Sequence, residues 1–126
     1  MTRDNLYIGK AGEEQAVELL KKSGYMILAR NYRTKLGEID IIAKDKDTVC
    51  FIEVKTRGSD RFGLPLEAIS KTKQNQIVKV ALEFLNKHNL LAQKARFDIV
   101  SVVNSKSGSK LDLFRNAFEV DTRFIY

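Results

Sequence analysis

The spacing of apolar and polar residues along the chain predicts two helices. A helical apolar pattern runs from about Asn5 to Lys22 and ends at Ser23-Gly24, where glycine suits the left-handed residue that often follows a helix. A second helix follows Ser70, a residue type that caps helix N-termini. Its apolar positions recur at helical spacing, at Ile77, Val78, Ala81, Leu82 and Leu85.

Five strands are expected where short apolar runs lie between turn-forming residues. Asp45-Lys46-Asp47 and the segment from Ser105 to Ser109 are turn signals, and the segment from Gly58 to Pro65 is expected to be a loop. The expected strands are Tyr25 to Tyr32, a run that begins after Gly37, Thr48 to Thr56, Phe97 to Val103, and Leu111 to Phe114. The resulting order, αβββαββ, indicates an α/β protein without internal repeats.

Two of these strands carry acidic residues within otherwise apolar runs. If a two- or four-residue loop closes the hairpin between them, Asp40 lies directly opposite Glu53, with Lys55 on the same face. The opposite face of the hairpin is apolar throughout and comprises Ile39, Ile41, Ala43, Cys50, Ile52 and Val54. The charged face is apolar at its middle, so we expect another element to cover the middle and leave the charged end open.

The facing pair of carboxylates has two interpretations. Cβ atoms of directly opposite residues lie about 5 Å apart, a distance at which like charges destabilise a sheet. One carboxyl group must stay protonated, or a cation must lie between the two. Lys55 supplies one positive charge, so a buried Asp-Glu-Lys network is one interpretation. The other is a divalent metal site, and oxygen ligands without histidine or cysteine suit Mg²⁺ or Mn²⁺.

The first helix supplies a third acidic residue. Glu13 lies in the middle of the apolar stripe of this helix, which is formed by Leu6, Gly9, Ala16, Val17 and Leu20. A glutamate at the centre of a packing face is expected to meet positive charge, and the charged end of the hairpin is the candidate. Alternatively, Glu13 sits at the exposed end of the stripe and reaches solvent.

Composition favours one globular domain, residues 1–126. The chain has 44% hydrophobic residues, and its single cysteine and single histidine provide neither a disulfide framework nor a zinc signature. No apolar run approaches the roughly 20 residues of a membrane span, and no signal peptide is apparent, so a cytoplasmic location without membrane association is expected.

The formal net charge of +6 fits a polyanionic partner such as nucleic acid. Basic residues gather beside the charged strands and in the first turn of the second helix, where the helix dipole also favours an anion. Gln74 faces inward there and either donates to a phosphate or bound water, or satisfies the helix N-terminus or solvent. The candidate nucleic-acid contacts are Arg33, Lys35, Arg57, Arg61, Lys71, Lys73 and Gln74.

Longer motifs surround the charged residues. They are Gly12-Glu13 with Ala16, Gly24-Tyr25, Asn31-Tyr32-Arg33, Gly37-Glu38-Ile39-Asp40-Ile41-Ile42-Ala43, Phe51-Ile52-Glu53-Val54-Lys55-Thr56-Arg57, Arg96-Phe97-Asp98-Ile99-Val100 and Asn116-Ala117-Phe118. Asp40, the hairpin and Glu53-Val54-Lys55 resemble the PD-(D/E)xK nuclease core, with Ile39 at the position of the proline in that name. The whole set resembles the bacterial YraN, or UPF0102, family, which is related to archaeal Holliday junction resolvases.

The resemblance implies a restriction-endonuclease-like fold, with a central mixed sheet flanked by helices. It also implies a metal-dependent nuclease acting on DNA, which includes branched or structured DNA as in the resolvases. The implied catalytic residues are Glu13, Asp40, Glu53 and Lys55, and the implied metal ligands are Asp40, Glu53, the Val54 carbonyl and Glu13. A homodimer is expected by analogy, because related junction enzymes cut symmetric substrates.

The alternative is a nucleic-acid-binding or interaction module whose nuclease-like site is inactive or depends on a partner. That module would bind nucleic acid without turnover. An inactive site usually lacks one of its members, whereas Glu13, Asp40, Glu53 and Lys55 are all present in this chain. The sequence therefore favours the enzyme and leaves both hypotheses open.

Overall fold

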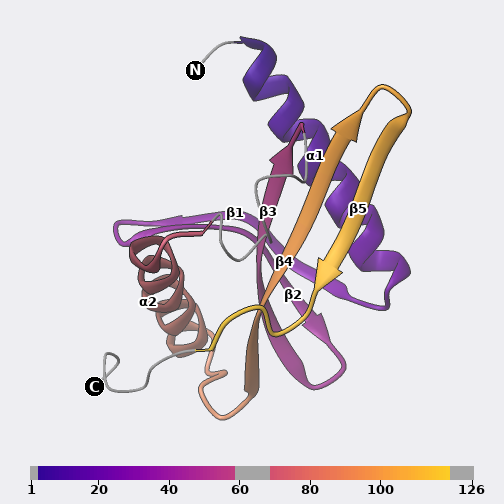
Figure 1. The fold of residues 1–126 in the computed structure, drawn as a ribbon. Coiled ribbons are helices and arrows are strands. Elements are labelled where there is room, and N and C mark those ends of the chain that lie inside the picture. The colour runs from indigo at the N-terminus through magenta and orange to yellow at the C-terminus, as the bar shows by residue number, and fades with distance from the viewer. Residues whose placement is uncertain (1–2, 59–68, 120–126) are drawn as a thin grey trace.

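The computed structural model describes residues 3–58 and 69–119, with side chains from residue 10 onward (Figure 1). Its elements follow the predicted order: α1 (Arg3–Lys22), β1 (Met26–Thr34), β2 (Gly37–Asp45), β3 (Thr48–Arg57), α2 (Lys71–Lys87), β4 (Lys94–Ser105) and β5 (Gly108–Phe114). The order αβββαββ is therefore confirmed, although most strands are longer than predicted. The predicted loop beyond Gly58 lies outside the described residues, and the burial of Leu6 and Gly9 in the predicted stripe is likewise not described.

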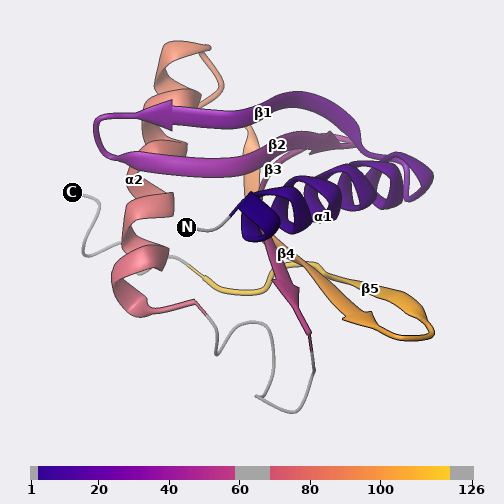
Figure 2. The ribbon, with the colours of Figure 1, turned by 90° about the horizontal axis from the view of Figure 1, so that it is seen from above.

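The five strands form one mixed sheet in the order β1-β2-β3-β4-β5. β3 and β4 run parallel, and the other neighbouring pairs are antiparallel. The two helices lie against opposite faces of this sheet, which Figures 1 and 2 show from two directions. Each face therefore has its own apolar core, and the strands between the helices are apolar on both sides.

The α1-side core and the α2-side core divide the hairpin strands between them. The α1-side core is built from Ala16, Val17, Leu20, Tyr25, Ile41, Ala43, Cys50, Ile52, Val100 and Val102. The α2-side core is built from Ile39, Ile42, Val49, Phe51, Ile77, Val80, Ala81, Phe84, Leu85, Phe97 and Phe118. Helix α2 thus covers the apolar middle of the charged face, as predicted. Val80 and Phe84 join this core, whereas Val78 of the predicted series is only partly buried against it and Leu82 is not among its residues.

The predicted register of the β2–β3 hairpin is confirmed. Its turn has two residues, Lys46 and Asp47, and Lys46 takes a left-handed conformation with φ 56°. The ladder pairs Asp45 with Thr48 at the turn and continues to a last pair of Ile41 with Ile52. Asp40 and Glu53 are the next residues along each strand, so they follow immediately where the ladder ends.

The prediction that Ile39 shares a face with Ile41 was wrong. Ile39 belongs to the α2-side core, whereas Ile41 belongs to the α1-side core. In β1, which pairs Arg30 with Ile41 and Tyr32 with Ile39, the residue opposite Asp40 is Asn31, and it has a left-handed φ of 51°. A left-handed residue breaks the regular alternation of side chains along a strand. The β1–β2 ribbon therefore turns at Asn31 and Asp40.

A buried polar network ties together the end of the sheet near the β2–β3 turn. Asp98 is fully buried on β4, and its carboxylate accepts hydrogen bonds from the Tyr25 hydroxyl (2.8 Å) and the Arg96 guanidinium (2.9 and 3.1 Å). Arg96 also donates to Asp45 at the end of β2 (3.0 Å), and Arg115 donates to the Tyr25 hydroxyl (3.2 Å). These bonds compensate the buried charge and connect β2, β4 and the segment after β5.

Candidate functional site

The Asp40 side chain ends the β2–β3 ladder. Its Oδ2 accepts a hydrogen bond of 2.8 Å from the main-chain nitrogen of Val54, at the position where β2 turns away from β3. A buried main-chain N–H needs an acceptor, and here a carboxylate supplies it. This bond fixes the Asp40 carboxylate beside the peptide that joins Glu53 to Val54.

Glu53 is the second acidic residue of the site, and its carboxylate is only partly satisfied. Its Oε2 is buried and has no hydrogen-bond partner among the residues that the structure describes. Burial, followed by the charge of Asp40, raises the pKa of Glu53 well above its usual range. Burial also raises the pKa of Asp40, and the charge of Glu13 raises it further, against the lowering effect of the Val54 hydrogen bond. The two carboxyl groups therefore form a pair that resists double ionisation unless a cation is present.

Two lysines bring positive charge to this pair. Lys55 lies two residues after Glu53 on β3, as predicted, and Lys73 comes from the first turn of α2. The charges of both lysines favour the ionised form of Glu53, and Lys73 does the same for Asp40. Lys73, predicted as a nucleic-acid contact, is thus also part of the surroundings of the acidic pair.

These lysines do not close the buried Asp-Glu-Lys network that the sequence allowed. None of the ion pairs formed among the described residues joins Lys55 or Lys73 to Asp40 or Glu53. A structural network would satisfy its buried acceptors, whereas here Glu53 keeps a buried oxygen without a partner. Either a proton shared between the Glu53 and Asp40 carboxyl groups, which are close enough to hydrogen-bond, or a bound cation would compensate the pair.

Glu13 reaches the same region from the opposite face of the sheet. It is half-buried on α1, and its charge acts on Asp40. The preceding Gly12 is buried against β3, where a Cβ atom would overlap Oγ1 of Thr56, so glycine is what lets α1 approach this closely. The helix packing thereby sets the position of Glu13 relative to the pair.

The predicted metal ligands fit a divalent ion only in part. In residues 3–58 and 69–119, no three acidic, histidine or cysteine side chains group closely enough to hold a metal. Glu13 therefore does not complete a closed ligand set with Asp40 and Glu53. Two carboxylates, one with an unpartnered oxygen, still suit Mg²⁺, which binds one or two carboxylates and keeps several waters.

The predicted nucleic-acid contacts divide into several positions. Arg33 is exposed near the β1–β2 turn and pairs with Glu38 (3.4 Å), and Lys35 is exposed in that turn. Lys71 is exposed at the start of α2, and Arg57 is half-buried at the end of β3. Arg61 lies outside the described residues.

The Gln74 amide bonds to the segment that leads into α2, a contact that neither of the predicted alternatives described. Its side-chain nitrogen donates to the main-chain oxygen of Ile69 (3.1 Å). The N-cap role of Ser70 is confirmed, because its hydroxyl accepts from the Lys73 nitrogen (3.1 Å). Gln74 thus supports the entry into α2, and its amide nitrogen is already engaged within the protein.

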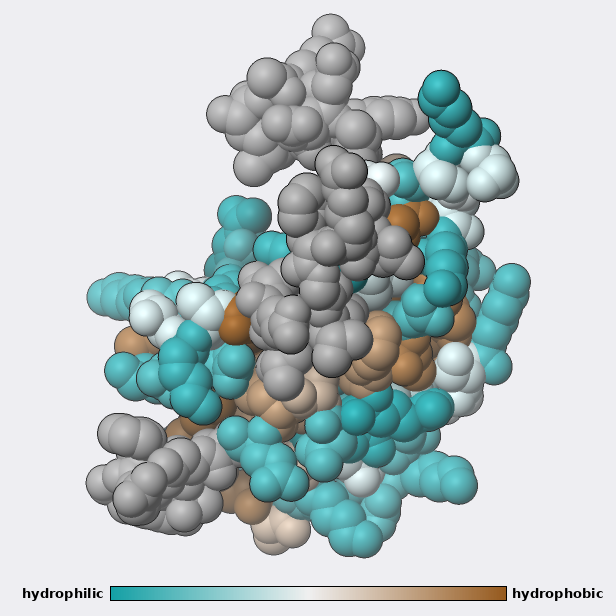
Figure 3. Space-filling model, in the orientation of Figure 1, coloured by the Kyte–Doolittle hydropathy of each residue, from teal (hydrophilic) through white to brown (hydrophobic). Residues whose placement is uncertain are grey.

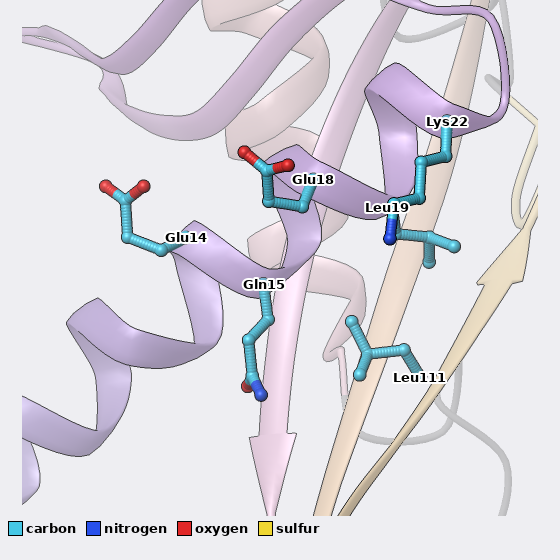
Figure 4. A pocket seen from close by; sticks show the side chains of 6 residues that line it. All are labelled: Glu14, Gln15, Glu18, Leu19, Lys22 and Leu111. Atoms are coloured by element: carbon cyan, nitrogen blue, oxygen red, sulfur yellow. The ribbon is translucent and has the colours of Figure 1, made fainter.

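An apolar hollow lies apart from the acidic pair on the surface of the described residues. It has a volume of about 390 Å³ and lies between α1 and β5, lined by Glu14, Gln15, Glu18, Leu19, Lys22 and Leu111 (Figure 4). Its lining includes none of the candidate site residues. The face seen in Figure 3 is mainly hydrophilic, with apolar residues visible in gaps between polar ones. Neither α1 nor α2, as far as the structure describes them, combines the length and the apolar composition that a membrane-spanning helix needs.

Asn31 is a site neighbour that the sequence did not assign. It stands opposite Asp40 in the β1–β2 register, and its side-chain amide faces the Glu13 carboxylate. The available signal was an asparagine within a strand, where this residue type is uncommon unless the backbone is left-handed. The family-like motif contained Asn31, but the hydrophobic pattern gave it no role.

The fold and the site thus define a mixed α/β protein with an acidic pair where two strands separate. The chain belongs to the family described as "Uncharacterised protein family UPF0102", which it matches over residues 12–102. A UPF0102 protein of Syntrophus aciditrophicus is 47% identical over 92% of this chain and 91% of its own length. One from Caldicellulosiruptor saccharolyticus is 50% identical over 88% of this chain and 96% of its own length.

Proposed function

We propose that this protein is a metal-dependent nuclease that hydrolyses phosphodiester bonds in DNA, with a restriction-endonuclease-like core. The observation that carries the proposal is the Asp40–Glu53 pair: both carboxyl groups have raised pKa values, and Glu53 has a buried oxygen without a partner among the described residues. Perturbed acidic pairs of this kind are typical of functional sites. The resemblance to PD-(D/E)xK nucleases supports the same chemistry.

Asp40, Glu53 and the Val54 carbonyl would hold one or two Mg²⁺ or Mn²⁺ ions. The ion would lower the pKa of a bound water and neutralise charge that develops on the phosphate. Glu13, which lies near the pair without completing a closed ligand set, would orient the water or join the ligands when substrate binds. Lys55 would position the nucleophile or stabilise the transition state, because its charge already acts on Glu53.

Lys73 adds positive charge beside the carboxylates, at the N-terminus of a helix with no acidic residue in its first turn. A phosphate is favoured there by the helix dipole. Arg33, Lys35, Arg57, Arg61 and Lys71 would bind neighbouring backbone phosphates with little base preference. Branched or structured DNA is the proposed substrate, and a cytoplasmic homodimer is the proposed form, both by analogy with the junction resolvases.

The test is cleavage of labelled duplex, single-stranded, flap and four-way DNA, with the matching RNAs, in the presence of Mg²⁺ or Mn²⁺. Wild-type protein is expected to cut at least one substrate, whereas Asp40→Ala and Lys55→Ala are expected to lose cleavage. Lys87→Ala is the matched control, because Lys87 lies in the last turn of α2, at the opposite end of the helix from Lys73. Equal cleavage by wild type and both site variants would show that the activity comes from a contaminant.

The second candidate is a nucleic-acid-binding module with a partner-dependent or inactive site. It is favoured by the observation that Glu13 does not complete a ligand set with the pair among the described residues. Salt-dependent binding without cleavage of any substrate, in both metals, would support this alternative over the nuclease.

A further inference from the structure

The strand that faces α1 contacts two consecutive glutamates of that helix. Arg30 of β1 pairs with Glu14 at 2.6 Å. The neighbouring Asn31 faces Glu13, and when its amide nitrogen points at the carboxylate, this nitrogen lies 3.3 Å from each of the two Glu13 oxygens. That orientation pairs a donor with acceptors, whereas the reverse would set an oxygen against a carboxylate. Two adjacent residues of β1 therefore hold two adjacent residues of α1.

The backbone of Asn31 is shaped for this contact. Its φ of 51° is left-handed, in a strand where its paired neighbours Arg30 and Tyr32 keep the same register with β2. A left-handed residue inside a strand is uncommon, and asparagine is among the few residues that accept it. The conformation coincides with the turn of the β1–β2 ribbon at Asp40. Asn31 therefore has two structural roles. Its backbone turns the β1–β2 ribbon where Asp40 reaches Val54, and its side chain faces Glu13.

We propose that Asn31 is a positioning residue: its amide holds the Glu13 carboxylate toward Asp40 and Glu53, and so increases the affinity of the pair for a divalent cation. The inference rests on the proposed metal site but not on nuclease activity. Donors that orient a nearby carboxylate commonly change metal affinity by about 10- to 100-fold when removed. Glu13 needs such an anchor because it does not form a closed ligand set with the pair in the described residues.

The first test is independent of metal. In ¹⁵N-labelled protein, the side-chain amide signals of Asn31 are expected to move in Glu13→Gln and to stay in place in Glu14→Gln. Glu14 is the matched control, because it is the adjacent helix residue and pairs with Arg30 instead. Asn31 amide signals that are unchanged by Glu13→Gln would overturn the proposal, whatever the protein cleaves.

The second test measures Mn²⁺ affinity by calorimetry. Asn31→Gly keeps the left-handed backbone and removes the amide, and is expected to weaken Mn²⁺ binding about tenfold. Asn31→Asp also accepts the left-handed backbone but sets a carboxylate against Glu13, so a larger loss is expected. Asn89→Gly is the control, because Asn89 is another exposed asparagine with a left-handed φ, 57°, beyond the end of α2. It is expected to bind as wild type.

The double variant separates positioning from a purely structural role. In a Glu13→Gln background, Asn31→Gly is expected to cause no further loss of Mn²⁺ affinity, because its target carboxylate is gone. A role limited to the backbone would leave both Asn31→Gly and Asn31→Asp at wild-type affinity, which would overturn the proposal, as would a wild type that binds no Mn²⁺. Mn²⁺ binding with the expected variant order but no cleavage would uphold this inference and reject the nuclease.

Discussion

The carboxylate of Asp40 accepts a 2.8 Å hydrogen bond from the Val54 nitrogen, immediately beyond the last β2–β3 pair, Ile41 with Ile52. A side chain therefore occupies the place that a main-chain acceptor of β2 would otherwise fill. Asp40 lies where β2 leaves the ladder, and its bond to β3 keeps its carboxylate beside Glu53. Asp40 therefore both ends the β2–β3 ladder and forms half of the acidic pair.

Asp40→Ala is expected to be less stable to unfolding than Asp40→Asn at neutral pH. Alanine leaves the Val54 N–H without its acceptor, which costs about 1 to 3 kcal/mol, whereas asparagine keeps an acceptor oxygen and removes one of two close negative charges. Urea denaturation of the two variants and wild type measures the difference. Equal stability of both variants would show that the hydrogen bond to Val54 contributes nothing.

The stability of the metal-free protein is expected to fall as pH rises through the range in which the acidic pair ionises. The folded-state pKa is raised from 3.8 to about 6 for Asp40 and from 4.5 to about 8 for Glu53, with burial as the main cause of each. Between the unfolded and folded values, the folded state binds more protons than the unfolded state, so a rise in pH favours unfolding. The contribution is present below about pH 4 and is lost by about pH 8.

Glu53→Gln tests this sign, because glutamine cannot ionise. At pH 8 this variant is expected to exceed wild type in its free energy of unfolding by at least about 1 kcal/mol. At pH 4 the two proteins are expected to converge. Chemical denaturation at both pH values provides the measurement, and saturating Mg²⁺ should reduce the gap by stabilising wild type. A gap that is larger at pH 4 than at pH 8 would contradict the assignment.

The sequence predicted the acidic pair because a two-residue turn fixes the register of a hairpin. Once the turn is placed at Lys46 and Asp47, counting outward along both strands brings Asp40 and Glu53 to the same level of the hairpin. The alternation rule also separated most residues of the two cores correctly. It failed at Ile39, because the left-handed backbone of Asn31 turns the ribbon, and a period-2 pattern carries no sign of such a turn.

Contacts between distant elements were less predictable. The helical stripe placed Glu13 on the packing face of α1, but the distance between Glu13 and the pair depends on how closely α1 approaches β3 at Gly12. The inward position of Gln74 was predicted, yet its bond to Ile69 depends on the path of the chain before α2. Periodicity gives the face of a residue, and tertiary packing decides what it meets there.

Gly12→Ala is expected to destabilise the protein by roughly 1 to 3 kcal/mol and to weaken Mn²⁺ binding. The added methyl group would overlap Oγ1 of Thr56, so α1 and β3 must separate or Thr56 must rotate, and Glu13 follows the helix. Thr56→Ala removes the overlapping atom, so the double variant is expected to recover part of both losses. Strictly additive effects in unfolding and Mn²⁺ titrations would show that the two residues do not limit the helix position.

Tyr25→Phe is expected to destabilise the protein by about 1 to 3 kcal/mol without changing Mn²⁺ affinity. The hydroxyl donates to the fully buried Asp98 and accepts from Arg96 and Arg115, so its removal leaves buried groups unsatisfied at the end of the sheet near the β2–β3 turn. Burial raises the pKa of Tyr25 to about 12, which keeps this donor protonated at any pH used for the titrations.

Tyr32→Phe is the matched control for that measurement. Tyr32 packs its ring edge-on against Phe84, with 5.3 Å between ring centroids, and none of the side-chain hydrogen bonds among the described residues involves its hydroxyl. Its loss of one hydroxyl is expected to change the free energy of unfolding by less than about 0.5 kcal/mol. If both tyrosine variants unfold at the same urea concentration, the Asp98 network does not stabilise this end of the sheet. A loss of Mn²⁺ affinity in Tyr25→Phe would mean that the network and the acidic pair are coupled along β2, which carries Asp45 at its end and Asp40 in its first half.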